Sequence, residues 1–112
     1  MRIYVPATVD LLAQWHEAGQ LPSTADGFVP PDDSEEGEYA ALMSAADASA
    51  ALLAGAGRRV VVVVETDGAG DGPVPLREAV AVHADETERP ADADPDEDLG
   101  WFAVQEIPDL LG

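Results

Sequence analysis

The stretch RRVVVVVE, residues 58–65, decides the fold of this chain. Valine is β-branched, so it loses little extra side-chain freedom in a strand and packs well on a pleated surface. A strand with one face in water would alternate apolar and polar residues, whereas the five valines at 60–64 are continuous. The stretch therefore predicts a central strand that is covered on both faces.

Four other segments are predicted to be strands. Residues 2–7 alternate in polarity, and Pro6 ends that strand or places it at a sheet edge, because proline cannot donate a ladder hydrogen bond. Residues 27–29 predict a short strand between turns. Residues 77–84 and 101–107 predict two longer strands, followed by one helical turn over the final PDLLG.

Two helices are predicted between these strands. The first covers residues 9–18, with Thr8 as its N-cap and Gly19 as its left-handed end. The second runs from about 35 to 54 and begins at Asp33 or Ser34. Its apolar face is predicted from residues that recur at steps of three and four: Tyr39, Leu42, Met43, Ala46, Ala50 and Leu53.

This order of elements predicts an α+β fold in a single domain, residues 1–112. We expect a two-layer sandwich, with a mostly antiparallel sheet of four or five strands and two helices on one face. Loops, the C-terminal tail or a second subunit would then have to cover the other face. A homodimer is therefore consistent with the sequence.

The composition is strongly acidic and limits the partners. The formal charge is −18, from 23 acidic residues and five arginines, and lysine is absent. Such a surface repels nucleic acid and anionic lipid over about 8 Å at physiological salt, and favours solubility or a basic partner. The lack of cysteine excludes disulfides and thiolate zinc sites. Without a membrane span or leader pattern, we expect a cytoplasmic protein that binds neither nucleic acid nor membrane.

The segment 85–98 concentrates eight acidic residues and one arginine. A calcium loop started at Asp92 or at Asp94 fails at the glycine of position 6 and the glutamate of position 12. A decoy for nucleic-acid-binding proteins would need carboxylates on a rigid surface, and this segment looks flexible. We therefore interpret 85–98 as a solvated, mobile connector and expect no metal site.

The residues that could take part in catalysis or ligand binding do not form a catalytic motif. GAGDG at 68–72 lacks the strand-to-helix context and the lysine of a phosphate loop, so it more simply links two strands. His83 lies two residues before Asp85 and could act as a general base, but no serine, threonine or cysteine has a nucleophile context. Arg58 and Arg59 could form an anion site, or pair with carboxylates and protect the valine strand from aggregation. We predict no catalytic residue and no cofactor.

Two hypotheses for function remain open. The first is an interaction or regulatory module with no chemistry of its own. The alternative is a small-molecule-binding protein or minor enzyme with a pocket between the first helix and the sheet. That pocket would lie near Tyr4, Trp15, His83 and Trp101.

Several segments together resemble a known family. They are MRIYVPAT at 1–8, EYAALMSAADASAALL at 38–53, RRVVVVVE at 58–65, VAVHAD at 80–85 and WFAVQEIPDLL at 101–111. In this order they resemble a family of small proteins of unknown function from high-GC Gram-positive bacteria. The resemblance implies a cytoplasmic, single-domain bacterial protein, and implies no catalytic residue.

Overall fold

The computed structural model describes residues 1–67 and 72–112, and within these ranges the chain forms an antiparallel four-stranded sheet. The strand order is β1-β3-β5-β6. The bounds are Arg2–Ala7 for β1, Val60–Glu65 for β3, Ala79–Ala84 for β5 and Gly100–Phe102 for β6. The α+β class and the antiparallel sheet are confirmed. Most of GAGDG at 68–72 lies outside the described residues.

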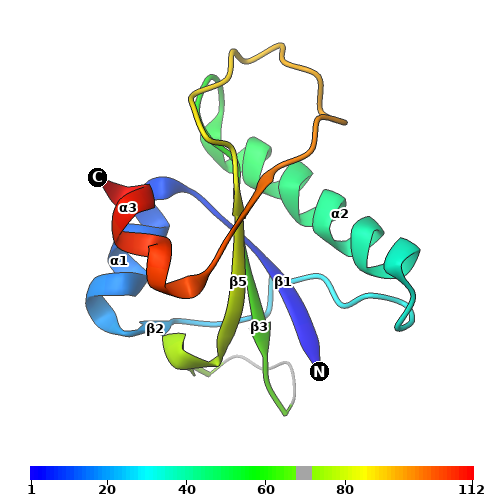
Figure 1. The fold of residues 1–112 in the computed structure, drawn as a ribbon, viewed down its shortest axis with the longest axis vertical. Coiled ribbons are helices and arrows are strands. Elements are labelled where there is room, and N and C mark those ends of the chain that lie inside the picture. The colour runs from blue at the N-terminus through cyan, green and yellow to red at the C-terminus, as the bar shows by residue number, and fades with distance from the viewer. Residues whose placement is uncertain (68–71) are drawn as a thin grey trace.

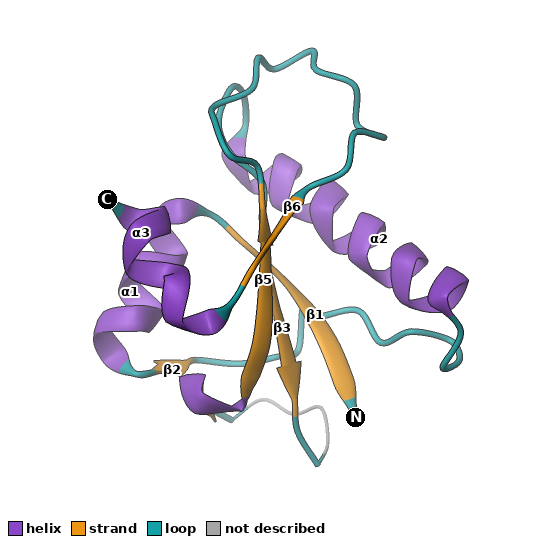
Figure 2. Ribbon diagram, in the orientation of Figure 1, coloured by secondary structure: helices purple, strands orange, loops and turns teal. Residues whose placement is uncertain are grey.

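Strand β3 is the centre of the sheet, as the valine run predicts. It pairs with β1 on one side and with β5 on the other (Figure 2). Val60, Val62 and Val64 belong to the hydrophobic cluster on one face, whereas Val61 and Val63 belong to the cluster on the opposite face. Every one of these valines is at most 3% exposed. The prediction of a strand covered on both faces is therefore confirmed.

The helices lie on opposite faces of the sheet, so the expected placement of both on one face of a two-layer sandwich is wrong. Helix α1 (Val9–Ala18) and helix α3 (Ile107–Leu111) cover one face, and helix α2 (Glu35–Leu53) covers the other (Figure 1). The reason is that both faces of β3 are apolar, and one helix layer on each face removes both from water. The result is three layers, so no second subunit is needed to cover the valines.

The connector between α1 and α2 passes from one face of the sheet to the other. It can do so because β1 is an edge strand. It passes the outer edge of β1, where the Phe28 N–H donates to the Tyr4 carbonyl (2.8 Å) and the Tyr4 N–H donates to the Phe28 carbonyl (2.9 Å). The short strand expected at 27–29 is reduced to this single bridge. Upstream, β2 (Gln20–Leu21) pairs with β4 (Val74–Pro75) in a small second sheet.

Helix α2 packs on the sheet mainly through its small residues, and of the large residues that we predicted only Leu42 packs against the cluster on that face. The buried positions of the helix are Gly37, Ala41, Ala45, Ala46 and Ser49. Tyr39, from the predicted apolar face, is 50% exposed. Small side chains let the helix backbone approach a sheet whose own face is already filled by valine. The predicted face is correct at Ala46, which is buried, and at Leu42, which is half-buried and packs against the same cluster, but as a whole it is rotated around the helix axis.

Ser49 links α2 to both β1 and β3 through hydrogen bonds. Its hydroxyl donates to the Ala7 carbonyl (2.6 Å) and accepts from the Val60 N–H (2.9 Å). The serine is fully buried. It therefore satisfies two main-chain groups at the end of the β1–β3 ladder, where each would otherwise be buried without a partner.

Both ends of α1 and the start of α2 follow the predicted chemistry, whereas α2 ends at Ala54, which takes the left-handed conformation at φ 55°. Thr8 caps α1 by accepting a hydrogen bond from the Leu11 N–H (3.1 Å), and Gly19 ends it in the left-handed region at φ 75°. Of the two candidates for the start of α2, Ser34 is the N-cap, because its hydroxyl accepts from the Gly37 N–H (3.0 Å).

The last predicted strand is shorter than expected. Strand β6 ends at Phe102, because the Glu106 carboxylate folds back and accepts from the Ala103 N–H (2.9 Å) in a turn over Val104–Glu106. Helix α3 follows, so the helical turn expected over PDLLG is present. Ile107 and Leu110 are buried, and the C-terminal tail thus helps to cover the α1 side of the sheet.

Candidate functional site

The four residues predicted to line a pocket do not converge in the structure. Tyr4 belongs to the hydrophobic cluster on the α2 face, and Trp15 belongs to the cluster on the α1 face. The sheet therefore separates these two aromatic residues.

His83 and Trp101 are brought together, because they are direct cross-strand partners on β5 and β6. Alternation along each strand places both on the α2 face, since Val82 and Phe102 pack toward α1. Helix α2 packs mainly on β1 and β3, so this part of the sheet is less covered, and Trp101 is 62% exposed. Burial lowers the pKa of the half-buried His83 below its usual value.

The carboxylate next to His83 in sequence is not available to it. Asp85 is 5% exposed and accepts hydrogen bonds from the Arg59 main-chain N–H (2.9 Å), Nε (2.9 Å) and Nη2 (2.8 Å). Burial alone would raise the pKa of Asp85, but the hydrogen bonds and charge of Arg59, with the charge of Arg89, outweigh it and lower the pKa. The Asp85 carboxylate is therefore a structural counter-ion.

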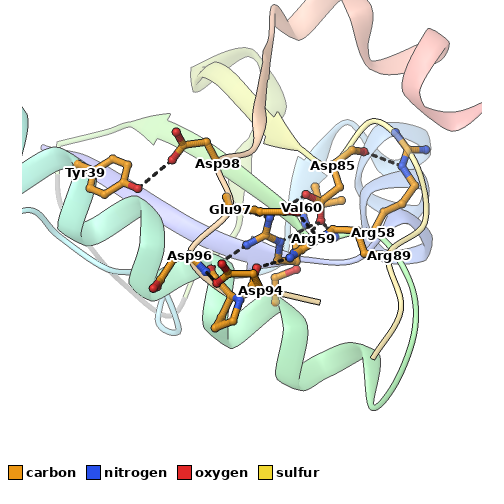
Figure 3. A network of polar contacts seen from close by, with 12 residues as sticks. Tyr39, Arg58, Arg59, Val60, Asp85, Arg89, Asp94, Asp96, Glu97 and Asp98 are labelled. Carbon is orange, nitrogen blue, oxygen red and sulfur yellow. Dashed lines mark hydrogen bonds and ion pairs between the residues drawn. The ribbon is translucent and has the colours of Figure 1, made fainter. Parts of the chain in front are cut away.

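The polar network around Asp85 also holds the acidic segment 85–98 (Figure 3). Arg59 donates through Nη1 to the Pro95 carbonyl (3.2 Å) and through Nη2 to the Glu97 carbonyl (2.9 Å). Arg89 donates to the Asp94 carbonyl and exchanges main-chain hydrogen bonds with Gly57. Pairing with a carboxylate is thus observed for Arg59, whereas Arg58 Nε donates to the main-chain carbonyl of Asp85 (2.8 Å).

Apart from the buried Asp85, the acidic side chains of this segment are exposed to solvent, as predicted, but its main chain is held by hydrogen bonds from Arg59 and Arg89. Asp92, Asp94, Asp96 and Asp98 are exposed. The Asp94 carboxylate accepts from the Asp96 main-chain N–H (2.9 Å), and the Asp98 carboxylate accepts from the Tyr39 hydroxyl (2.8 Å). Across the described ranges, no three His, Cys, Asp or Glu side chains are grouped so that they could hold a metal ion. Nor is any helix in these ranges long and apolar enough to cross a membrane.

A groove beside β1 offers the best candidate site. It has a volume of about 500 Å³, within the range typical of ligand pockets. Strand β1 contributes Val5 and Pro6, and helix α1 contributes Leu11 and Trp15. Helix α2 adds Leu52, which is 53% exposed. This groove, which we call the α1–α2 groove, contains Trp15 of the four predicted residues, but not Tyr4, His83 or Trp101.

The local sequence explains why the α1–α2 groove stays open. Helices α1 and α2 lie on opposite sides of β1, and beyond the bridge to Phe28 the outer edge of β1 reaches Pro6. Proline has no N–H, so a further strand cannot extend the ladder at this position. The connector instead closes the rim with Pro22, Ser23 and Asp26.

The sequence contains only a weak signal for the α1–α2 groove. Leu52 falls outside the face that we predicted for α2, and an apolar residue outside the core face of a helix can indicate a contact surface. Asp26 in a connector has no pattern that would single it out. These residues become neighbours only through the crossing of the connector around β1.

Comparisons with known proteins give one match. Residues 1–111 match the model of DUF6912, described as a family of unknown function. No curated protein and no solved structure matches the chain.

Proposed function

Since the chain belongs to DUF6912, a family of unknown function, we propose a role from its geometry. We propose that the protein is a non-catalytic interaction module that binds an apolar segment of a partner protein in the α1–α2 groove. The observation that carries the proposal is an open, mostly apolar groove of about 500 Å³ with the exposed side chain of Leu52 at its lip.

The energetics of burial favour this use of the groove. Covering a side chain such as leucine yields roughly 1.5–3 kcal/mol, so one or two apolar side chains of a partner would provide a useful anchor. Trp15, which is 7% exposed, forms a rigid wall, and Val5, which is 3% exposed, lies in the floor. Aromatic residues of this kind recur at the centres of protein interfaces.

The arrangement of the polar residues supports a role without catalysis. Within the described residues, the carboxylate nearest His83 in sequence is bound to Arg59, and Tyr4 and Trp15 lie on different faces of the sheet. A general base needs a substrate position within hydrogen-bond reach, and the α1–α2 groove does not include His83.

The test uses the protein's own tryptophans. In a Trp101→Phe background, the remaining Trp15 reports on the α1–α2 groove. We expect a neutral peptide with two leucines four residues apart, separated and flanked by glutamines, to shift the Trp15 emission in a saturable way. Leu52→Ser should weaken this binding at least fivefold, because it removes the apolar lip.

Val29→Ser is the matched control, because Val29 is similarly exposed (49%) and does not line the groove. It should leave the affinity within twofold. Failure of the neutral peptide to bind at millimolar concentration, or equal weakening by both substitutions, would contradict the proposed function.

A second candidate function, binding of a small molecule, is favoured by one observation. The rim of the α1–α2 groove carries the Asp26 carboxylate beside an apolar interior, which suits a compact apolar cation. A thermal-shift screen of metabolites separates the two candidates. Hits that depend on Asp26 and Leu52, without peptide binding, would favour the small-molecule role.

We also propose the finer properties of the protein. Residues 1–112 act as one domain in the cytoplasm, and the charge of −18 disfavours nucleic acid as a partner. The homodimer stays a prediction, although α2 now covers the face that motivated it. Light scattering at micromolar concentration tests it, and a strict monomer would remove it.

A further inference from the structure

We infer that the partner segment bound by the α1–α2 groove is basic, with arginine or lysine next to an apolar anchor. This inference rests on the proposed function and adds the chemistry of the partner. It follows from the distribution of charge around the groove and from the charge of the whole chain.

The groove has a negative rim and no arginine among its described lining residues. Asp26 lines the rim and is exposed. A carboxylate at the mouth of an apolar groove attracts a cation that follows a buried apolar side chain.

The arginines of the chain bind other groups or lie apart from the groove. Arg2 bonds Glu38 (2.7 Å) and Glu65 (3.2 Å). Arg58 donates to main-chain carbonyls, and Arg59 and Arg89 hold the acidic segment. Arg77 is exposed on the turn Leu76–Glu78 and does not line the groove. Lysine is absent from the sequence, so no lysine or described arginine of the chain neutralises Asp26 at the rim, and a cationic partner residue can pair with it.

The other occupants of the groove are disfavoured by the same charges. A second copy of this chain would bring another −18 toward the first, and at low salt this repulsion extends well beyond contact. An acidic partner meets the same barrier. A basic segment gains from the attraction during encounter, which increases association rates by about 10–10³-fold and falls steeply with ionic strength.

The experiment compares three peptides with the same two-leucine anchor and different flanks. The flanking residues are lysine, glutamine or glutamate, and binding is read from Trp15 emission in the Trp101→Phe background. At 20 mM NaCl we expect the lysine peptide to bind about tenfold more tightly than the glutamine peptide, and the glutamate peptide to bind most weakly. At 500 mM NaCl the difference should shrink to about twofold, because salt screens the exposed charges.

Two substitutions separate recognition at the groove from attraction to the whole acidic surface. Asp26→Asn should weaken the lysine peptide about threefold and leave the glutamine peptide unchanged. Asp67→Asn removes the same charge from an exposed residue that does not line the groove, and should have no more than a small effect. Leu52→Ser should weaken both peptides.

The outcomes distinguish the two proposals. Equal affinities of the three peptides, all lost with Leu52→Ser, would overturn the basic partner but support the proposed function. Binding of the lysine peptide that ignores Leu52→Ser would overturn the inference, because the attraction would then belong to the acidic surface as a whole. No binding of any peptide would overturn both.

Discussion

Asp85→Asn removes the negative charge that neutralises a buried guanidinium. The side chains of Arg59 and Asp85 are 3% and 5% exposed and are joined by a 2.8 Å contact between Nη2 and Oδ1. Asparagine has nearly the same shape, so the substitution opens no cavity, but it removes the charge and replaces one acceptor oxygen with an NH₂ donor. The guanidinium of Arg59 would remain buried without its counter-ion.

The magnitude follows from the contacts that are lost. Oδ2 of Asp85 accepts from the main-chain N–H and the Nε of Arg59, both at 2.9 Å. An asparagine amide has one acceptor oxygen, and its NH₂ group would face donors. Breaking a buried ion pair by removing one partner costs about 3–5 kcal/mol. Out of a typical stability of about 5–15 kcal/mol, this corresponds to a melting temperature lower by about 12–20 °C.

The assay is guanidinium chloride unfolding at pH 7, followed by tryptophan emission and by far-UV circular dichroism. Asp92→Asn is the matched control, because it makes the same change in charge at an exposed position of the same segment. Its free energy of unfolding should stay within about 0.5 kcal/mol of the original. The double variant Arg59→Met, Asp85→Leu should recover only part of the lost stability. Apolar residues can replace the buried ion pair, but the Arg59 main-chain N–H and the Pro95 and Glu97 carbonyls lose their partners.

The effect should also depend on pH with a definite sign. The pKa of Asp85 is lower in the folded chain than in the unfolded chain, so its stabilisation is complete above the unfolded pKa of about 3.9. It is lost as the pH falls through the lower, folded pKa. The difference in stability between the original protein and Asp85→Asn should therefore be constant above about pH 5 and shrink below pH 4. A loss under 1 kcal/mol at pH 7, or a difference unchanged to pH 2, would refute the reasoning.

Four further outcomes are expected. Ser49→Ala should cost about 2 kcal/mol in denaturant unfolding, because two buried main-chain groups lose their partner, whereas the exposed Ser44→Ala should be nearly neutral. Ala45→Leu should cost about 1–3 kcal/mol by overpacking the helix against the sheet, while Ala40→Leu on the exposed side of α2 should not. The His83 imidazole should titrate below 6.5 by NMR. Because its pKa is lower in the folded chain, its contribution to the free energy of unfolding should fall as the pH drops below its pKa in the unfolded chain. The melting temperature should rise with salt from 10 to 500 mM, because screening weakens the self-repulsion of −18 charges.

Those elements whose causes are local could be predicted from the sequence. The continuous valines of 60–64 predict the interior strand, because neither face tolerates water, and the structure buries all five. The limits of α1 follow from Thr8 and Gly19, whose effects act within a turn of the helix. Pro6 predicts an edge position for its strand, and β1 is an edge strand.

The site could not be predicted, because its residues meet only through contacts between distant segments. Of the four predicted pocket residues, Trp15 alone lines the α1–α2 groove, and the groove also needs Leu52 from α2 and Asp26 from the connector. The order of apolar residues within a helix does not state how close the helix lies to a sheet. For that reason the apolar face predicted for α2 is rotated from the small-residue face that packs on the sheet.

By itself, the sequence determined the long strands β1, β3 and β5, the caps of α1, the N-cap of α2 and the acidic character of the chain, since these depend on neighbouring residues and on composition. Only the tertiary structure decided which face each helix covers, because the connector crosses the edge of β1 at Phe28. It also decided that the acidic segment is held in place, through a pair between Arg59 and Asp85 that lies 26 residues apart in sequence. Such pairings depend on the path of the whole chain, and no local pattern contains them.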